Sequence, residues 1–241
     1  MYRFAPFEKT LLAFFIFIGS LICIRIFFTG SLHFIFLVWN LFLAWIPFRL
    51  SFYLIRIINI KKWKQLLLLA GWLLFFPNAL YIITDLIHLG LESKVPKWFD
   101  AVLIFSASVV GLMMAFISLY RVELFLEKNI HKKRVPIVII FILFLGSFGV
   151  YLGRFLRWNS WDIISNPSDL LLTVVQRLVF PLDHLQTWGI TSVLTVLYYL
   201  LYFSIKKLPG YIFPHQGSDG LEPSDSVKNP TRVPHTKRVF L

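Results

Sequence analysis

The sequence is poor in charge and in cysteine, and each shortage excludes a class of protein. Only 15% of the 241 residues are charged, whereas 58% are hydrophobic, with 26 Phe and 8 Trp. Soluble domains carry roughly a quarter charged residues, because a large apolar surface does not stay in water. The single cysteine, Cys23, excludes an intramolecular disulfide and a cysteine-based metal site. A lipid bilayer is therefore the expected surroundings of the chain.

Six apolar segments are long enough to cross a bilayer, which takes about 20 residues per helix. They cover approximately residues 10–28, 32–50, 64–84, 100–120, 136–153 and 185–205. A shorter apolar stretch, 170–180, predicts an interfacial or re-entrant helix in the last outer loop. The predicted fold is all-α: a polytopic transmembrane helix bundle over residues 1–207, followed by a disordered, proline-rich cytoplasmic tail over 208–241.

Basic residues are distributed unevenly between the two faces of this bundle. Six spans place both termini on one side, and 18 of the 24 Lys and Arg lie there, whereas the 12 acidic residues divide equally. The positive-inside rule therefore predicts that both termini are cytoplasmic. The net charge of +12 follows from this topology, so it requires no nucleic-acid partner.

Small residues predict close helix packing in two of the spans. At helical spacing, the fourth and fifth spans carry Ala107, Gly111, Ala115, Gly146, Gly149 and Gly153. Packing within one chain is the first interpretation, and a homodimer through these faces is the alternative. Pro77 should kink the third span and free a backbone carbonyl near Asn78 that needs a partner inside the protein.

Polar residues concentrate at the outer ends of the spans. One helical stripe in the third span carries Asn78, Tyr81, Asp85 and His88, at offsets 0, 3, 7 and 10. Asp100 opens the fourth span from the same side. A second group follows the fifth span and comprises Arg154, Arg157, Trp158, Asn159, Trp161 and Asp162. An aromatic belt explains single members of this set, so it is the clustering that favours a site. Arg25, near the outer end of the first span, is expected to snorkel to the interface.

Three sequence blocks add a resemblance. They are W-L-L-F-F-P-N-A-L-Y-I-I-T-D-L-I-H-L from Trp72, W-F-D from Trp98 and G-V-Y-L-G-R-F-L-R-W-N-S-W-D from Gly149. In order and spacing they resemble a bacterial multi-pass membrane family known as domain of unknown function 1361, over roughly residues 35 to 205. Leu80 stands where the resemblance leads us to expect proline. The resemblance implies a bacterial cytoplasmic (inner) membrane location and no particular chemistry.

Three functions are open on the sequence alone. The first is an enzyme or binder that acts at the outer face on an anionic lipid or a lipid-linked substrate. Arg154 and Arg157, three apart on one helix face, would clamp a phosphate or carboxylate, while Trp158 and Trp161 would stack a sugar or line a headgroup pocket. The second is an accessory or assembly role without catalysis, and the third is small-solute transport.

The first hypothesis assigns a role to each polar residue. Catalysis would use Asp85, His88 and Asp100. Substrate binding would use Asn78, Tyr81, Arg154, Arg157, Trp158, Asn159, Trp161 and Asp162. If the site held a metal ion, the ligands would be Asp85, His88, Asp100, Asp162 and His184. No recognised metal-ligand spacing is present, so we predict neither metal nor cofactor. Whether the protein is an enzyme is left open. The residues should converge in one outer-facing pocket, where an open cavity favours binding and closed pairs favour scaffolding.

Overall fold

The computed structural model describes residues 5–56, 61–89 and 95–212, and this part of the chain is helical throughout apart from its connecting turns. Its helices, with the 3₁₀ helices labelled η, are α1 (Ala5–Thr29), η1 (His33–Ile35), α2 (Phe36–Arg56), α3 (Lys62–Tyr81), η2 (Ile82–His88), α4 (Lys97–Asn129), η3 (Lys132–Arg134), α5 (Val135–Phe155), α6 (Asp162–Ser165), α7 (Pro167–Val179), η4 (Pro181–His184) and α8 (Leu185–Ile212).

Six helical segments of this part are long and apolar enough to cross a membrane, which confirms the predicted polytopic bundle. They are Phe7–Thr29, His33–Arg56, Lys62–Ile87, Lys97–Asn129, Lys132–Phe155 and Pro181–Tyr211. The helix α7 forms where the sequence predicts a helix too short to cross. Its location at the membrane interface stays a prediction.

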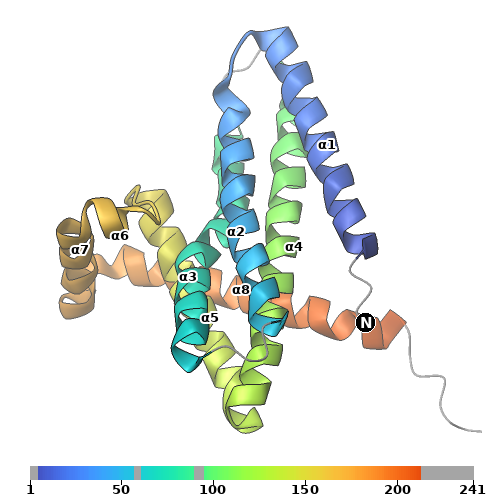
Figure 1. Cartoon of the computed structure of the whole chain (residues 1–241). Helices are drawn as coiled ribbons and strands as arrows, with labels where there is room; N and C mark the ends of the chain where they lie inside the picture. Colours follow the sequence, from blue (N-terminus) through green and yellow to red (C-terminus); the bar gives the residue numbers. More distant parts are fainter. Residues whose placement is uncertain (1–4, 57–60, 90–94, 213–241) are drawn as a thin grey trace, which may run out of the picture. The chain divides into compact units, whose positions relative to one another are not determined.

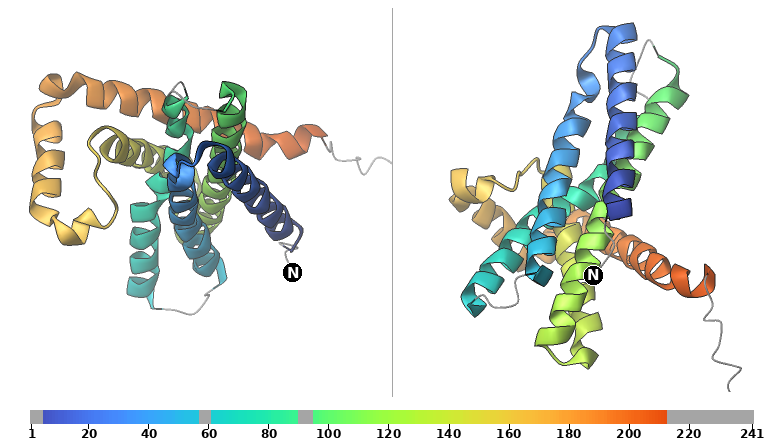
Figure 2. Two further views of the ribbon diagram at one scale, coloured as in Figure 1. Left: turned by 90° about the horizontal axis from the view of Figure 1, so that it is seen from above. Right: turned by 45° about the vertical axis from the view of Figure 1, so that its right-hand side comes forward.

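The helix α4 is the centre of the packing. It contacts α1, α2, α3 and η2, while α3 packs in turn against α2 and α5. Figure 1 shows α1, α2 and α4 side by side. Figure 2 shows α6 and α7 beyond α5, at the opposite edge from α1. The faces of α3, α4 and α5 that meet therefore determine which polar side chains come together.

Two glycines let these helices approach closely. A Cβ atom on Gly149 would lie 2.5 Å from Cγ of Pro77, and one on Gly111 would lie 2.7 Å from Cδ1 of Ile82. Real Cβ atoms do not come so close to a neighbour, so a larger residue would push α5 away from α3, or α4 away from η2. The small faces are occupied within one chain, and a homodimer would find no free surface at these two positions.

Pro77 interrupts the hydrogen bonding of α3, and side chains donate to two carbonyls in the turn before it. A proline has no N–H to donate to the preceding turn. Nδ2 of Asn78 donates to the carbonyl of Phe75 at 3.1 Å, and the hydroxyl of Ser160 donates to the carbonyl of Leu74 at 3.2 Å. The carbonyl that the missing N–H leaves free is that of Leu73, four residues earlier, and an internal partner for it stays a prediction. The hydroxyl of Ser160 ties the loop after α5 to α3.

The helix α4 continues past residue 120, where the predicted fourth span ends, and buries two charged residues beyond that point. Arg121 is 3% exposed and donates to the carbonyl of Phe48 at 3.0 Å. Glu123 is 4% exposed and accepts from the hydroxyl of Tyr202 at 2.6 Å. A span predicted from hydropathy ends at the first charged residue. The partners of Arg121 and Glu123 allow the helix itself to continue inside the protein.

The chain divides after Tyr202 into two units. Of the second unit the structure describes residues 203–212, which are the last part of α8. The predicted cytoplasmic tail begins at 208, so its first five residues are helical. Residues 213–241 lie outside the described part of the chain, and the disorder of the tail stays a prediction.

Candidate functional site

An arginine–aspartate pair joins η2 to α5 inside the bundle. Asp85 is fully buried, and Nη1 of Arg154 lies 3.1 Å from its Oδ1. Arg154 also donates to the hydroxyl of Tyr81 and to the carbonyl of Thr84, both at 3.0 Å. Nδ2 of Asn40 donates to the second carboxylate oxygen of Asp85 at 2.9 Å. Each charge therefore has an opposite charge and further hydrogen-bond partners, as a buried ion pair requires.

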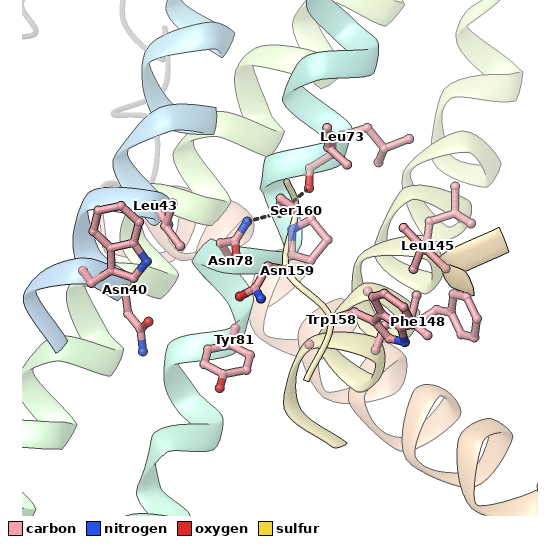
Figure 3. Close-up of a pocket in the computed structure, with 17 residues that line it drawn as sticks. Asn40, Leu43, Leu73, Asn78, Tyr81, Leu145, Phe148, Trp158, Asn159 and Ser160 are labelled. Atoms are coloured by element: carbon pink, nitrogen blue, oxygen red, sulfur yellow. Dashed lines mark hydrogen bonds between the residues drawn. The ribbon is translucent and has the colours of Figure 1, made fainter. Parts of the chain in front are cut away.

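A cavity of about 270 Å³ lies between α2, α3, α5 and the loop that follows α5 (Figure 3). The polar side chains in its wall are Asn40, Asn78, Tyr81, Asn159 and Ser160. The apolar and aromatic side chains include Trp39, Leu43, Leu73, Leu74, Leu145, Phe148 and Trp158. Because Asn40 and Tyr81 also contact the buried ion pair, the pair supports one side of this wall.

The polar and apolar parts of the wall come from different elements. Asn159 and Ser160 belong to the loop after α5, which returns along α3 as far as the carbonyl of Leu74, whereas Leu145 and Phe148 lie within α5. Trp39 is 52% exposed, so the cavity reaches the molecular surface beside α2. The cavity therefore offers hydrogen-bonding groups from α2, α3 and the loop, and hydrocarbon from α5.

The loop after α5 begins with a reversal of the chain. α5 ends at Phe155, and Arg157 adopts a left-handed conformation with φ of 61°. The N–H of Trp158 then donates back to the carbonyl of Leu152 at 3.1 Å, and Arg157 is exposed. The prediction that Arg154 and Arg157 share one helix face is wrong, because the helix ends between them.

Asp162 holds this loop in its turn. Its carboxylate accepts from the backbone N–H of Asn159 at 2.6 Å and from the hydroxyl of Ser165 at 3.0 Å. These hydrogen bonds, the backbone one above all, lower the pKa of Asp162 below its ordinary 3.8. The ring of Trp161 lies 6.1 Å from that of Trp39, centroid to centroid, so the loop also contacts α2. The position of Asn159 is therefore supported by two independent contacts.

A second buried ion pair lies between α1 and α4. Nε of Arg25 donates to Oδ1 of Asp100 at 2.8 Å, and the guanidinium carbon lies 4.1 Å from the ring centre of Phe34. Arg25 is 5% exposed and Asp100 is 7% exposed. The prediction that Arg25 snorkels to the interface is wrong, because α4 supplies a carboxylate inside the protein. Neither charged residue lines the cavity.

The structure thus separates the predicted site residues into three groups. Those that line the cavity are Asn78, Tyr81, Trp158 and Asn159. Those that contact lining residues are Asp85, Arg154, Trp161 and Asp162. Asp100 and Arg157 lie elsewhere, and the side chain of His88, at the end of η2, lies outside what the structure describes. The catalytic and binding roles of all these residues stay predictions. Over the described ranges, no three carboxylate, imidazole or thiol groups gather closely enough to hold a metal ion.

Two polar lining residues, Asn40 and Ser160, are absent from the predicted set, as is the exposed Trp39. Asn40 is the informative omission, because a single amide in an otherwise apolar span has to find a partner inside the protein. Its partner is Asp85, and this hydrogen bond brings α2 into the wall of the cavity. Its isolation in the second span is the signal that would have found it.

Comparison with known proteins adds a family and no function. The model of a family described as "Protein of unknown function (DUF1361)" matches residues 39–201, which is more than half of the chain. Neither the curated proteins nor the solved structures include a match to this chain. The matched range contains every residue that lines the cavity, whereas Arg25 and the rest of α1 lie before it.

Proposed function

The chain belongs to the family of proteins of unknown function DUF1361, and we propose that it binds the headgroup region of a lipid or lipid-linked molecule in the outer leaflet. Six apolar helices make it a multi-pass membrane protein. The proposed binding site is the cavity between α2, α3 and α5.

One observation carries this proposal: the cavity joins a polar side to an apolar side. The polar side has the amides of Asn78 and Asn159, and the apolar side has Leu145 and Phe148. Ligand sites typically combine a mostly apolar wall with a few placed polar groups. A membrane lipid has the same two parts, a polar headgroup and apolar chains. The cavity matches such a molecule in polarity.

The arrangement favours binding over a chemical reaction. The described residues that line the cavity include no carboxylate and no imidazole. Asp85 is buried in its ion pair with Arg154, and Asp100 is paired with Arg25. A general base must reach the proton that it removes. Neither Asp85 nor Asp100 is among the described residues that line the cavity.

An accessory role in assembly is the second candidate, and the closed ion pair favours it. Asp85 and Arg154 leave each other little free capacity, as expected of groups that hold helices together. The two candidates differ in whether the cavity takes up a ligand. A cavity-filling variant therefore distinguishes them.

The lipid-binding proposal is tested with two leucines that follow each other in α7. Leu170 lines the cavity, whereas its neighbour Leu171 is 64% exposed and does not. Leu170→Trp should fill the cavity, and Leu171→Trp is the matched control. Native mass spectrometry of the three proteins, purified from the same membranes, should find a retained lipid on wild type and Leu171→Trp and lose it in Leu170→Trp. Equal lipid retention by all three would favour the accessory role.

The bacterial inner membrane and the extracytoplasmic side of the cavity are part of the same proposal. The excess of basic residues on the terminal side supports this orientation. In a Cys23→Ser background, a membrane-impermeant maleimide should label Asn159→Cys in intact cells. It should label Lys132→Cys, an exposed position at the other end of α5, only after permeabilisation. The reverse pattern would place the cavity on the cytoplasmic side.

A further inference from the structure

Three asparagines line the cavity, and a hydrogen bond determines which way each side-chain amide faces. In each case the NH₂ group donates to an oxygen that only accepts: Asn40 to the Asp85 carboxylate at 2.9 Å, Asn78 to the Phe75 carbonyl at 3.1 Å, and Asn159 to the Asp162 carboxylate at 3.3 Å. A flipped amide would bring two acceptors together in all three cases. The orientation of each amide therefore follows from its partner.

The three amide oxygens are left for a ligand. Within the described ranges, no hydrogen bond reaches Oδ1 of Asn40, Asn78 or Asn159. Figure 3 shows the three side chains around one space, together with Tyr81 and Trp158. An amide oxygen accepts and does not donate. A molecule that satisfies this wall must bring hydrogen-bond donors.

The charge of the wall disfavours an anion. The cavity-lining residues of the described part carry no formal charge. The nearby guanidinium of Arg154 donates to Asp85, Tyr81 and Thr84. A phosphate or carboxylate at neutral pH offers only acceptors, so it would leave the three amide oxygens without a donor of their own. Zwitterionic phospholipid headgroups also contain a phosphate, so the same argument disfavours them. Hydroxyl groups fit this wall better, since each donates as well as accepts.

Size and aromatic lining narrow the choice further. A volume of about 270 Å³ lies just below the range of small-molecule sites, which begins near ~300 Å³. Trp39 and Trp158 add apolar ring surface and indole N–H groups, which is the combination of a polar tip and an apolar body that aromatic side chains offer. A pyranose ring presents C–H groups on its faces and hydroxyls around its edge. One such ring matches both the aromatic and the amide parts of the wall.

We propose that the cavity takes a single neutral sugar ring, the headgroup of a glycolipid, through the amide oxygens of Asn40, Asn78 and Asn159. This inference rests on the proposed lipid-binding function and names the class of its ligand. It replaces the anionic headgroup that the two arginines predicted from the sequence. The apolar wall around Leu145 then accommodates the first part of the lipid chains.

The experiment compares three lipids that differ only in their headgroup. The full chain is placed in phosphatidylcholine nanodiscs, purified with a polyoxyethylene detergent so that no glycoside detergent competes. The probes are glucosyl-diacylglycerol, phosphatidylglycerol and phosphatidylethanolamine with identical acyl chains, and native mass spectrometry gives the mole fraction that half-saturates the protein. The glucosyl lipid should half-saturate at about a tenfold lower fraction than the other two, as two or more added hydrogen bonds allow.

Single-residue controls separate the sugar contact from folding. Asn159→Ala removes one exposed amide but keeps the backbone N–H that bonds to Asp162. It should weaken the glucosyl lipid by about 2- to 10-fold, the effect of one neutral hydrogen bond, and leave the other two lipids unchanged. Asn166→Ala is the matched control, because Asn166 bonds to Asp169 and does not line the cavity.

The outcomes distinguish this inference from the function on which it rests. Preference for phosphatidylglycerol or phosphatidylethanolamine, lost in Leu170→Trp, would overturn the sugar assignment and keep the lipid site. If all three probes half-saturate the protein at mole fractions that Leu170→Trp does not change, both the lipid site and the sugar assignment are overturned. Equal weakening of all three by Asn159→Ala would show that the amide acts on the fold of the loop and not on a sugar.

Discussion

The two buried arginine–aspartate pairs look alike in their charges and differ in what surrounds them. Arg154 and Asp85 contact Tyr81 and Asn40, which line the cavity, whereas Arg25 and Asp100 join α1 to α4 and do not line it. The first pair lies within the range matched by the family, and Arg25 lies before it. Similar charge chemistry therefore supports a candidate site at one place and the attachment of a helix at the other.

This difference teaches that a buried charge in a membrane helix is not by itself a sign of function. Both pairs satisfy the requirement that a charge inside the protein has a partner. Only the contacts of the neighbouring neutral residues connect the first pair to a cavity. We therefore expect variants of the two pairs to differ in ligand binding and to lose similar amounts of stability.

The largest expected effect comes from removing the aspartate of each ion pair, which compares the two pairs directly. Asp85→Ala and Asp100→Ala should each lower the free energy of unfolding by about 3–5 kcal/mol, because each leaves an arginine buried without its carboxylate. Thermal unfolding in detergent measures this loss. Lipid binding at the cavity should fall only in Asp85→Ala, since Asn40 and Tyr81 lose their common support.

A double variant of the cavity pair tests whether the loss comes from the unpaired charge. Asp85→Leu combined with Arg154→Met should recover most of the stability, since replacing a whole ion pair with apolar residues is often neutral. If the double variant is as unstable as Asp85→Ala, the instability comes from lost packing or lost neutral hydrogen bonds.

A smaller effect is expected where α5 approaches α3. Gly149→Ala should lower stability by about 1–3 kcal/mol, because its Cβ would meet the rigid ring of Pro77. Gly19→Ala in α1 is the control, since nothing lies within 4 Å of its added Cβ, and it should change stability by at most about 1 kcal/mol, in the stabilising direction. Thermal unfolding measures both. Equal effects would mean that α3 and α5 are not held at this distance.

The turn after α5 should respond to backbone conformation and not to the arginine side chain. Arg157→Gly should keep or raise stability by up to about 1 kcal/mol, because glycine adopts a positive φ without strain. Arg157→Val should lower it by about 1–2 kcal/mol for the opposite reason. If Arg157→Gly abolishes lipid binding while stability is kept, the guanidinium contacts the ligand and the anionic headgroup regains support.

The smallest expected effect is a pH dependence of the loop. The pKa of Asp162 is lowered by the N–H of Asn159, so the folded carboxylate holds its proton less tightly than the unfolded one. Its stabilisation of the loop is fully present above about pH 4 and is lost as the pH falls through the lowered pKa. Fluorescence of the loop tryptophans should change below pH 4 in wild type and stay constant in Asp162→Asn. A change centred near pH 6 would assign the titration to another group.

Much of the fold was predictable because hydropathy is a local property. The six spans and the short helix α7 follow from the lengths of apolar runs. The span boundaries were less predictable, as α4 shows, because Arg121 and Glu123 are tolerated in the helix only through partners on other helices. A run of residues contains no information about such partners.

The candidate site was predictable in part. The stripe through Asn78, Tyr81 and Asp85 follows from helical spacing, and two of its members line the cavity. The pairing of Asp100 with Arg25 and the place of Asn40 in the wall did not follow. Spacing determines which residues share a face of one helix, but it does not say which neighbouring helix that face meets.

The sequence by itself determined that this chain is an all-helical membrane protein with polar residues gathered at one end of its spans, since composition and periodicity settle both. Only the tertiary structure decided that Asp85 binds Arg154, that Arg157 leaves its helix, and that three asparagines line one cavity. The reason is that a buried charge or amide is stable beside whichever partner the packing brings, and small residues such as Gly149 set that packing across helices far apart in the sequence.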